Sequence, residues 1–216
     1  MIELFIQLFG WTSMSPRRYS MASRTAAFAK TRQRILDATI KLHTQNGIFG
    51  TTWKDIATEA DVAVGTVYKH FPTLDDLVPA CGELLMERLR PPSPEAVTEI
   101  IGDATDPEER LRRVANELFA FYQRGGRHLE SDLRERELPA MREWEEYLRH
   151  MVAGFVREAL AHDGPGDDVV QAISFLFDFP TFNAMRIRGM TVDLAVETAT
   201  TMALCRLKGR GRTSTS

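Results

Sequence analysis

Residues 51–72 read TTWKDIATEADVAVGTVYKHFP, and this stretch decides the fold because it contains two short helical patterns around a tight turn. In the first pattern, predicted over 52–60, Thr52 stands at an N-cap position, and Ile56 and Ala57 form an inner face. The second pattern, predicted over 64–71, is rich in small and hydrogen-bonding residues. Two short helices that cross closely at a turn have the outline of a helix-turn-helix unit.

Helical patterns also flank this unit. One is predicted over 26–46 and ends at Gly47, because glycine suits the position just after a helix. The other is predicted over 74–89, opens with a capping-box pattern at Thr73, and contains Pro79, which should bend it. A cluster of prolines follows and separates this module from the rest of the chain.

The rest of the chain lacks the alternating pattern of a β-strand, and its glycines and prolines divide it into helical stretches. We therefore predict an all-α fold, in which an N-terminal helix-turn-helix module of about three helices plus a linking helix precedes a C-terminal helical domain. The further helices are predicted over 95–101, 108–124, 128–162 (two helices with a break near Leu138 and Pro139), 167–188 and 191–208.

These patterns divide the 216 residues into four parts. We predict a helix-turn-helix domain over 24–90 and a second helical domain over 91–208. Residues 1–23 are predicted to be a disordered or mis-assigned extension, because their apolar start is too short to span a bilayer and later methionines offer other translation starts. Residues 209–216 are predicted to form a flexible tail.

Composition and charge narrow the class of protein. Apolar residues make up 44% and charged residues 26% of the chain, which is typical of a soluble globular protein. Cys81 and Cys205 stand in no disulfide or metal-binding pattern, which fits a reducing cytoplasm. Residues 17–71 carry nine Lys or Arg against four acids, whereas residues 72–216 carry 18 against 25. The asymmetry indicates an N-terminal segment that binds a polyanion, and chance clustering is the alternative.

The motif in residues 51–72 runs T-T-x-x-x-I-A from Thr51, A-x-V from Ala60 and G-T-V-Y-x-H-F-P from Gly65. It resembles the DNA-binding module of the TetR (tetracycline-repressor-like) family of bacterial transcriptional regulators, over about residues 26–89. The resemblance implies a dimer whose C-terminal domain binds a small molecule. It also implies that paired modules bind a pseudo-palindromic operator and release it when that molecule binds, with repression as the usual mode.

The resemblance further implies which residues contact DNA. The N-terminal end of the second short helix would face base edges, where Gly65 allows close approach and Val64 can touch a thymine methyl. Lysine, tyrosine and histidine side chains would hold phosphates, and the alternative for Tyr68 and His70 is an ordinary surface role. The complete expected set is Thr52, Lys54, Val64, Gly65, Thr66, Tyr68, Lys69 and His70.

Two positions depart from the family pattern. Asp61 occupies the turn position where glycine is frequent, and Ala63 stands where a capping serine or threonine is common. The turn is expected to survive because aspartate can adopt a left-handed backbone. The second short helix is expected to lack a side-chain cap.

The resemblance implies pairing of two copies through the last two helices, 167–188 and 191–208. The first of these is apolar nearly all the way round, and a fully internal core helix is the alternative. Aromatic residues between 118 and 182 suffice either to line an apolar cavity or to fill it solidly. The expected effector is a largely apolar small molecule, and its expected contacts are Phe119, Tyr122, Met141, Trp144, Tyr147, Phe155, Phe175 and Phe179.

Two further expectations concern the mechanism. The charged run over 130–146 is expected to form a solvated face with i,i+4 ion pairs. Effector binding is expected to shift the helix that follows Pro72, bent at Pro79, and so to change the separation of the paired modules.

Catalytic patterns such as HExxH and GxSxG do not occur in the sequence, so we predict neither an enzyme nor a metal or other cofactor. The predicted function is that of a DNA-binding, ligand-responsive repressor, located in the cytoplasm with the nucleoid and not bound to a membrane. The alternative is a helical protein-binding or structural module that does not bind DNA.

Overall fold

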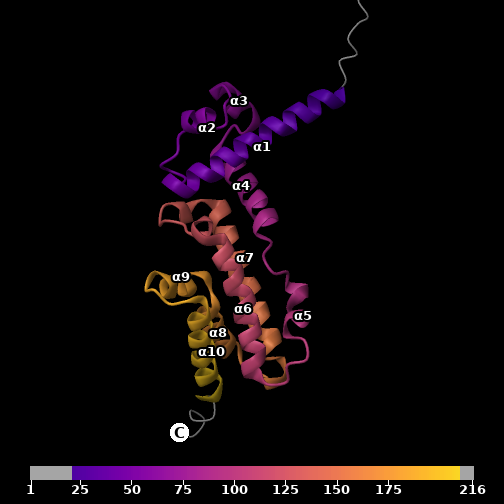
Figure 1. The fold of residues 1–216 in the computed structure, drawn as a ribbon, viewed down its shortest axis with the longest axis vertical. Helices are drawn as coiled ribbons and strands as arrows, with labels where there is room; N and C mark the ends of the chain where they lie inside the picture. Colours follow the sequence, from indigo (N-terminus) through magenta and orange to yellow (C-terminus); the bar gives the residue numbers. More distant parts are fainter. Residues whose placement is uncertain (1–20, 210–216) are drawn as a thin grey trace, which may run out of the picture. The chain divides into compact units, whose positions relative to one another are not determined.

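The computed structural model describes residues 21–209, and the side chains of residues 24–209. Residues up to Arg34 form one unit and residues from Ile35 another, so the contacts below all lie within residues 35–209. Residues 21–209 contain helices and no strand, which confirms the predicted all-α fold (Figure 1). The extension expected over 1–23 and the tail expected over 209–216 lie almost wholly outside the described residues, and both stay predictions.

Four helices make up the N-terminal part of the described chain, close to the predicted ranges. The first helix begins at residue 21, five residues before its predicted start, and the three others agree with the prediction to within one residue. Their bounds are α1 Met21–Asn46, α2 Trp53–Glu59, α3 Val64–His70 and α4 Leu74–Leu89.

Local hydrogen bonds explain where these helices start and stop. Thr52 caps α2 and Thr73 caps α4, each in a complete capping box with an aspartate three residues later. Gly47 has a φ of 77°, the left-handed conformation that ends α1 and that glycine adopts without strain. These three signals were all present in the sequence.

Both expected departures in the turn are confirmed. Asp61 adopts a left-handed backbone with a φ of 52°, so the turn between α2 and α3 forms without glycine. Ala63 takes the extended N-cap conformation, and α3 has no side-chain cap hydrogen bond. The first backbone N–H groups of α3 therefore have no side-chain acceptor from the N-cap residue.

The C-terminal part is a bundle in which α6 packs against α7 and α10, and α8 packs against both α7 and α10. Figure 1 shows α6, α7 and α10 running alongside one another. The elements are η1 Pro94–Ala96, α5 Val97–Ile101, α6 Pro107–Gly125, η2 Gly126–Leu129, η3 Glu135–Glu137, α7 Pro139–Ala159, η4 Ala161–Asp163, α8 Asp167–Phe177, α9 Phe179–Ile187 and α10 Val192–Lys208.

The helix predicted over 167–188 is wrong as a single element, because it is two helices that meet at Asp178. Pro180 has no N–H, and its ring would clash with the carbonyl of residue 176 in a continuous helix. Asp178 instead turns extended, with a ψ of 163°, and accepts the N–H of Thr181 at 3.0 Å as the N-cap of α9.

The first of the two helices predicted over 128–162 is also wrong, because residues 126–138 form only two short 3₁₀ turns. The Asp132 carboxylate accepts the backbone N–H groups of Arg134 and Glu135, both at 2.8 Å, and this local bonding competes with a helix. Leu138 is extended because it precedes a proline, and α7 starts at that proline.

Two hydrophobic cores form within residues 35–209. The first lies inside the four-helix module and is built around Ile35, Ile56, Val67 and Phe71, together with other buried residues of α1 to α4. The second fills the bundle around α6 and includes Leu89, the last residue of α4. The fourth helix thus contributes to both cores. Within the described part of the chain, no helix is long and apolar enough to cross a membrane.

Supplying the missing cap should stabilise the protein. We expect Ala63→Ser to raise the free energy of unfolding by about 0.5–2 kcal/mol, because the serine oxygen can accept an N–H in the first turn of α3. Urea unfolding followed by circular dichroism measures the difference. Ala63→Val, which offers no acceptor, is the matched control, and an equal effect of both substitutions would contradict the capping explanation.

Candidate functional site

The exposed face of α3 is formed by the residues that the sequence analysis singled out. Val64, Gly65, Tyr68 and Lys69 are exposed and recur at helical spacing, whereas Val67 is fully buried on the opposite side. The face combines an apolar side chain, bare backbone, a phenol and an ammonium group. Such a surface can approach a duplex closely at one end and contact phosphates at the other.

Gly65 leaves an open space on this face. A Cβ atom built at Gly65 has no atom within 4 Å, so nothing in the protein itself demands glycine there. Glycine in a helix lowers stability by about 0.5–1 kcal/mol relative to alanine. The missing side chain leaves room for another molecule to approach the backbone on this exposed face.

Trp53 supports this face, and the sequence analysis missed it. The Trp53 ring stacks on the Tyr68 ring with centroids 5.0 Å apart and planes at 30°. The contact joins the first residue of α2 to the exposed side of α3, so it fixes the direction of the phenol. An aromatic residue directly after the N-cap threonine was the available signal, but nothing in its local sequence identifies its partner.

The four other expected DNA contacts have different surroundings. The Thr52 hydroxyl donates to Asp55 Oδ2 at 2.6 Å and accepts the Asp55 N–H at 3.2 Å, and the first of these bonds lowers the pKa of Asp55. Lys54 is exposed. His70 is half-buried, with its ring 6.5 Å from that of Phe71, and Thr66 is half-buried as well. Lys54 is therefore the most accessible of these side chains.

A set of three contacts, which we call the latch, joins the end of α1 and the turn after it to the connection between α6 and α7. The backbone N–H of Ile48 donates to Glu135 Oε1 at 2.6 Å. Thr44 Oγ1 lies 2.6 Å from His128 Nδ1. The Arg134 guanidinium lies 4.5 Å from the centroid of the Phe49 ring, within range of a cation–π interaction.

Glu135 is the buried centre of the latch. Only 6% of the residue is exposed, and its second oxygen accepts the Asp132 N–H at 3.0 Å. This placement shows that the expectation of a uniformly solvated face over 130–146 is wrong at Glu135. The ion pair that the run does form, between Arg136 and Glu145 at 3.1 Å, spans nine positions rather than four.

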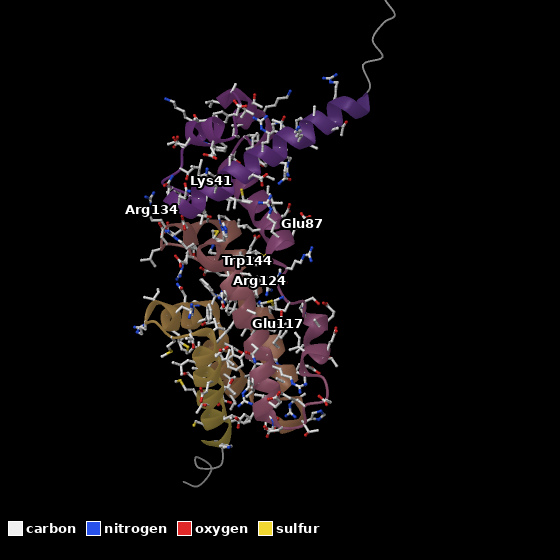
Figure 2. All side chains as sticks on the ribbon, viewed as in Figure 1. Lys41, Glu87, Glu117, Arg124, Arg134 and Trp144 are labelled. Carbon is white, nitrogen blue, oxygen red and sulfur yellow. The ribbon has the colours of Figure 1, made fainter. Side chains whose placement is uncertain are left out.

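A junction cavity of about 460 Å³ lies beside the latch. Its walls come from α1 and α4 on one side and from α7 and the preceding connection on the other. Figure 2 shows Trp144, one of its wall residues, on α7. His43 lines the cavity, and burial lowers its pKa to about 4, so its imidazole is neutral at neutral pH.

A domain cavity of about 490 Å³ lies between α6, α7 and α9. Tyr122, Trp144, Phe179 and Asp178 line it, and burial raises the pKa of Asp178. The Tyr122 hydroxyl donates to the carbonyl of Phe177 at 3.1 Å, so this phenol is anchored rather than free to turn toward an occupant.

The structure divides the eight expected effector contacts into three groups. Met141 and Trp144 line both cavities, Tyr147 lines the junction cavity, and Tyr122 and Phe179 line the domain cavity. Phe119 and Phe155 are fully buried in the core of the bundle, and Phe175 is 64% exposed. The aromatic residues thus line cavities at some positions and fill the core solidly at others.

One surface of α8 and α10 is apolar and uncovered in the described chain. Phe175 on α8, and Leu194 and Met202 on α10, are about half or more exposed. An ion pair at 2.6 Å between Arg206 and Asp168 joins the two helices beside this surface. On α10, Ala195, Val196, Ala199 and Ala203 are buried in the bundle, whereas Met202 is half exposed.

These features define a helix-turn-helix protein with an attached helical domain. Residues 35–81 match the family model described as "Bacterial regulatory proteins, tetR family". The chain is 39% identical over 77 residues to a probable acrEF/envCD operon repressor of Escherichia coli K12, a match that covers 32% of this chain and 35% of the relative. It is 48% identical over 42 residues to the transcriptional repressor KstR of Rhodococcus jostii, covering 19% of this chain and 20% of that one.

Structural similarity to known regulators extends beyond the segment that matches in sequence. A TetR-family transcriptional regulator from Streptomyces coelicolor superimposes with a TM-score of 0.59 at 23% identity, covering 88% of this chain and 96% of that one. In sequence, the chain matches only about a third or less of the length of these curated relatives. In fold, it agrees with the Streptomyces coelicolor regulator over most of both chains. Residues 35–81 thus resemble the tetR family of bacterial regulatory proteins, and the fold over most of the chain is similar to that of a solved TetR-family regulator. Both curated relatives are named as repressors, which agrees with the prediction that the chain is not an enzyme.

Proposed function

We propose that the protein is a transcriptional repressor that binds a pseudo-palindromic operator as a dimer and responds to a small, largely apolar molecule. The observation that carries the proposal is the exposed face of α3, with a bare backbone at Gly65 and Tyr68 held on Trp53. The two curated relatives described above are repressors, which supports the regulatory role. A protein that binds operators acts where the DNA lies, in the cytoplasm.

The two ends of the exposed face of α3 are proposed to contact different parts of the DNA. Val64, Gly65 and Thr66 occupy the first turn of α3, the part of such a helix that meets base edges. Lys69 and Tyr68 extend to phosphates, and His70, half-buried, contributes only from the rim. Across the turn, Lys54 supplies another charge, and the Thr52 N-cap orients α2 toward the DNA backbone.

The substitution Gly65→Ala is expected to change protein stability and DNA affinity in opposite directions. We expect the substitution to raise the free energy of unfolding by about 0.5–1 kcal/mol, because alanine favours the helix and its Cβ meets no atom. We expect it to weaken operator binding by about tenfold or more, because the added methyl group stands between the backbone and the bases. Gel-shift titration of duplexes selected from a randomised library measures the affinity.

Gly154→Ala on α7 is the matched control, because a Cβ there also has no atom within 4 Å. It should stabilise the helix in the same way and leave DNA affinity unchanged. Enrichment of an inverted repeat in the selection, with affinity that falls steeply as salt rises, supports the proposal. Failure to enrich any sequence at low salt, or equal binding by the Gly65→Ala protein, would remove it.

Dimerisation is proposed to cover the apolar surface of α8 and α10. Exposed phenylalanine, leucine and methionine side chains on adjacent helices cost free energy in water and are removed from it when two copies pair. A two-fold pair buries the same patch on both copies, which places two α3 helices in one assembly.

We expect Phe175→Glu to give a monomer in sedimentation velocity, because a buried carboxylate on the two-fold surface would face its own symmetry mate. The unmodified chain should sediment at twice its 24.4 kDa. Leu133→Glu is the control, since Leu133 is 82% exposed but lies outside α8 and α10. A monomeric unmodified chain, or a dimer unaffected by Phe175→Glu, would contradict this interface.

The effector is proposed to occupy the domain cavity, where Tyr122, Met141, Trp144 and Phe179 meet. The latch is the proposed route by which that domain acts on the DNA-binding module. Its contacts span from the connection before α7 to the turn that leads into α2. Pro79 lies on the wall of the junction cavity inside α4, and the hinge expected there stays a prediction.

Glu135→Gln should loosen the latch, because an amide provides only one acceptor oxygen for the two N–H groups that the carboxylate now satisfies. We expect faster hydrogen exchange at Ile48 and at least a threefold change in affinity for the selected duplex. A weaker affinity means that the latched arrangement is the DNA-binding one, and a stronger affinity means the reverse. Glu137→Gln, in the same 3₁₀ turn but exposed, should change neither quantity. Unchanged exchange and affinity in the Glu135→Gln protein would show that the latch does not couple the two parts.

A further inference from the structure

We propose that the junction cavity is a separate binding site for a bulky aromatic organic cation, and that an occupant there is sensed directly by the DNA-binding module. The proposal rests on the proposed function only for its consequence for DNA binding, because the binding itself can be measured without DNA. It concerns a different cavity and a different ligand charge from those proposed for the domain cavity.

The size and surface of the junction cavity suit an aromatic molecule. Its volume of about 460 Å³ is that of a site for a drug-sized ligand. Trp144 and Tyr147 stack on each other on one wall, with ring centroids 5.4 Å apart and planes at 24°. Leu85 and Met86 of α4 provide apolar surface on the wall from the other part of the chain. Stacked rings beside a flexible thioether accommodate flat or propeller-shaped aromatic groups.

The charges around the cavity favour a cation. Glu83, Glu130 and Glu143 line it, and within residues 21–209 none of the three forms an ion pair. The fourth carboxylate, Glu135, is satisfied by two backbone N–H groups but keeps its negative charge. Arg127 supplies the one permanently positive side chain in the wall.

The His43 side chain does not offset the negative charge of these glutamates. Because burial keeps its imidazole neutral at neutral pH, it adds no cation to the wall. Its Nε2 atom is buried and has no hydrogen-bond partner among residues 21–209. A neutral ring nitrogen in that position can bond an N–H or a polar group of an occupant, whereas an aliphatic wall could not.

An anion with the same shape as the proposed cation would be repelled at this site. Each unpaired carboxylate attracts a bound cation and repels a bound anion, and the faces of Trp144 and Tyr147 attract cations as well. The two effects act in the same direction, so charge rather than shape should separate otherwise equal ligands.

The position of the cavity gives an occupant direct access to the latch. Thr44, Ile48, His128 and Glu135 all belong both to the latch and to the cavity wall. A bulky ligand therefore touches both sides of the connection that joins the two parts of the chain. Any preference of the ligand for one arrangement of the latch becomes a change in DNA affinity.

Two ions of matched shape and opposite charge test the proposal. Isothermal titration calorimetry of the full chain, without DNA, should detect tetraphenylphosphonium binding at one site per chain. Tetraphenylborate should bind at least tenfold more weakly at that site. Equal or tighter binding of the borate, or no binding of the phosphonium, would overturn the assignment of ligand charge.

A blocking substitution identifies the cavity. Gly82 lines the junction cavity on α4, and a Cβ built there meets no atom within 4 Å, so Gly82→Phe can place its ring in the empty space. Replacing a helical glycine also favours the helix, which protects the fold. Phosphonium binding should be lost in this protein and retained with Ala184→Phe, which narrows the domain cavity instead. The opposite pattern would place the ligand in the domain cavity.

A charge substitution tests the role of the carboxylates. Glu130→Gln combined with Glu143→Gln should weaken phosphonium binding about tenfold and strengthen borate binding. Glu137→Gln removes one equal charge from the neighbouring 3₁₀ turn, lies outside both cavities, and should leave both affinities unchanged. Equal weakening by the control would mean that the overall charge, and not this wall, selects the ion.

The consequence for DNA is measured last and separately. Phosphonium should change the affinity for the selected duplex at least threefold in the unmodified protein and not in the Gly82→Phe protein. If the ion binds but DNA affinity stays unchanged, the sensing part of the proposal is wrong while the site stands. If no duplex is selected at all, the proposed function fails, and the calorimetric result still decides the binding site.

Discussion

The bond between the Glu135 carboxylate and the Ile48 N–H is the constraint on which the arrangement of residues 35–209 depends. A buried carboxylate is costly unless hydrogen bonds satisfy it, and here two backbone N–H groups from distant parts of the chain do so. Gly47 is required beside it, because a Cβ there would lie 3.0 Å from Glu135 Oε1 and the backbone φ is positive. The turn after α1 and the connection before α7 therefore fix each other. Within residues 35–209, this hydrogen bond therefore joins the residues that lead into α2 to those that lead into α7.

The exposed face of α3 follows from burial on its other side. Val67 and Phe71 are buried in the core of the module, so helical geometry turns residues 64, 65, 68 and 69 outward. The α2–α3 turn achieves this with Asp61 in a left-handed conformation, and α3 starts without a side-chain cap. A short, weakly capped helix keeps its place through packing rather than through its own propensity. The exposed face of α3 therefore takes no part in the packing of the module core.

Local signals made the module predictable, and non-local contacts made the rest hard to predict. Capping boxes, Gly47 and the apolar spacing fixed α1 to α4 to within one residue except at the start of α1, because each signal acts over three or four positions. The break at Asp178 was readable in principle, since Pro180 stands in the middle of the predicted helix. The burial of Glu135 was not predictable from the sequence, because its partner lies 87 positions away and both residues that flank it directly are charged. For the same reason the sequence indicated aromatic residues but not which of them would line a cavity, as the contrast between Phe155 and Trp144 shows.

The shared wall of the junction cavity has a thermodynamic consequence. Because latch residues and cavity residues are partly the same, the proposed ligand and a duplex on α3 would act on each other through one set of contacts. Linkage requires the two effects to be equal, so a ligand that weakens DNA binding by some factor is itself bound more weakly by that factor on DNA. The domain cavity shares Trp144, Met141, His128 and Glu130 with the junction cavity, so occupants of the two cavities would contact the same four side chains. Trp144 stands between them, and a change of its ring position on one side alters the space on the other. In the proposed mechanism, occupants of both cavities therefore act on one conformational equilibrium, whose central contact is the hydrogen bond of the buried Glu135 carboxylate.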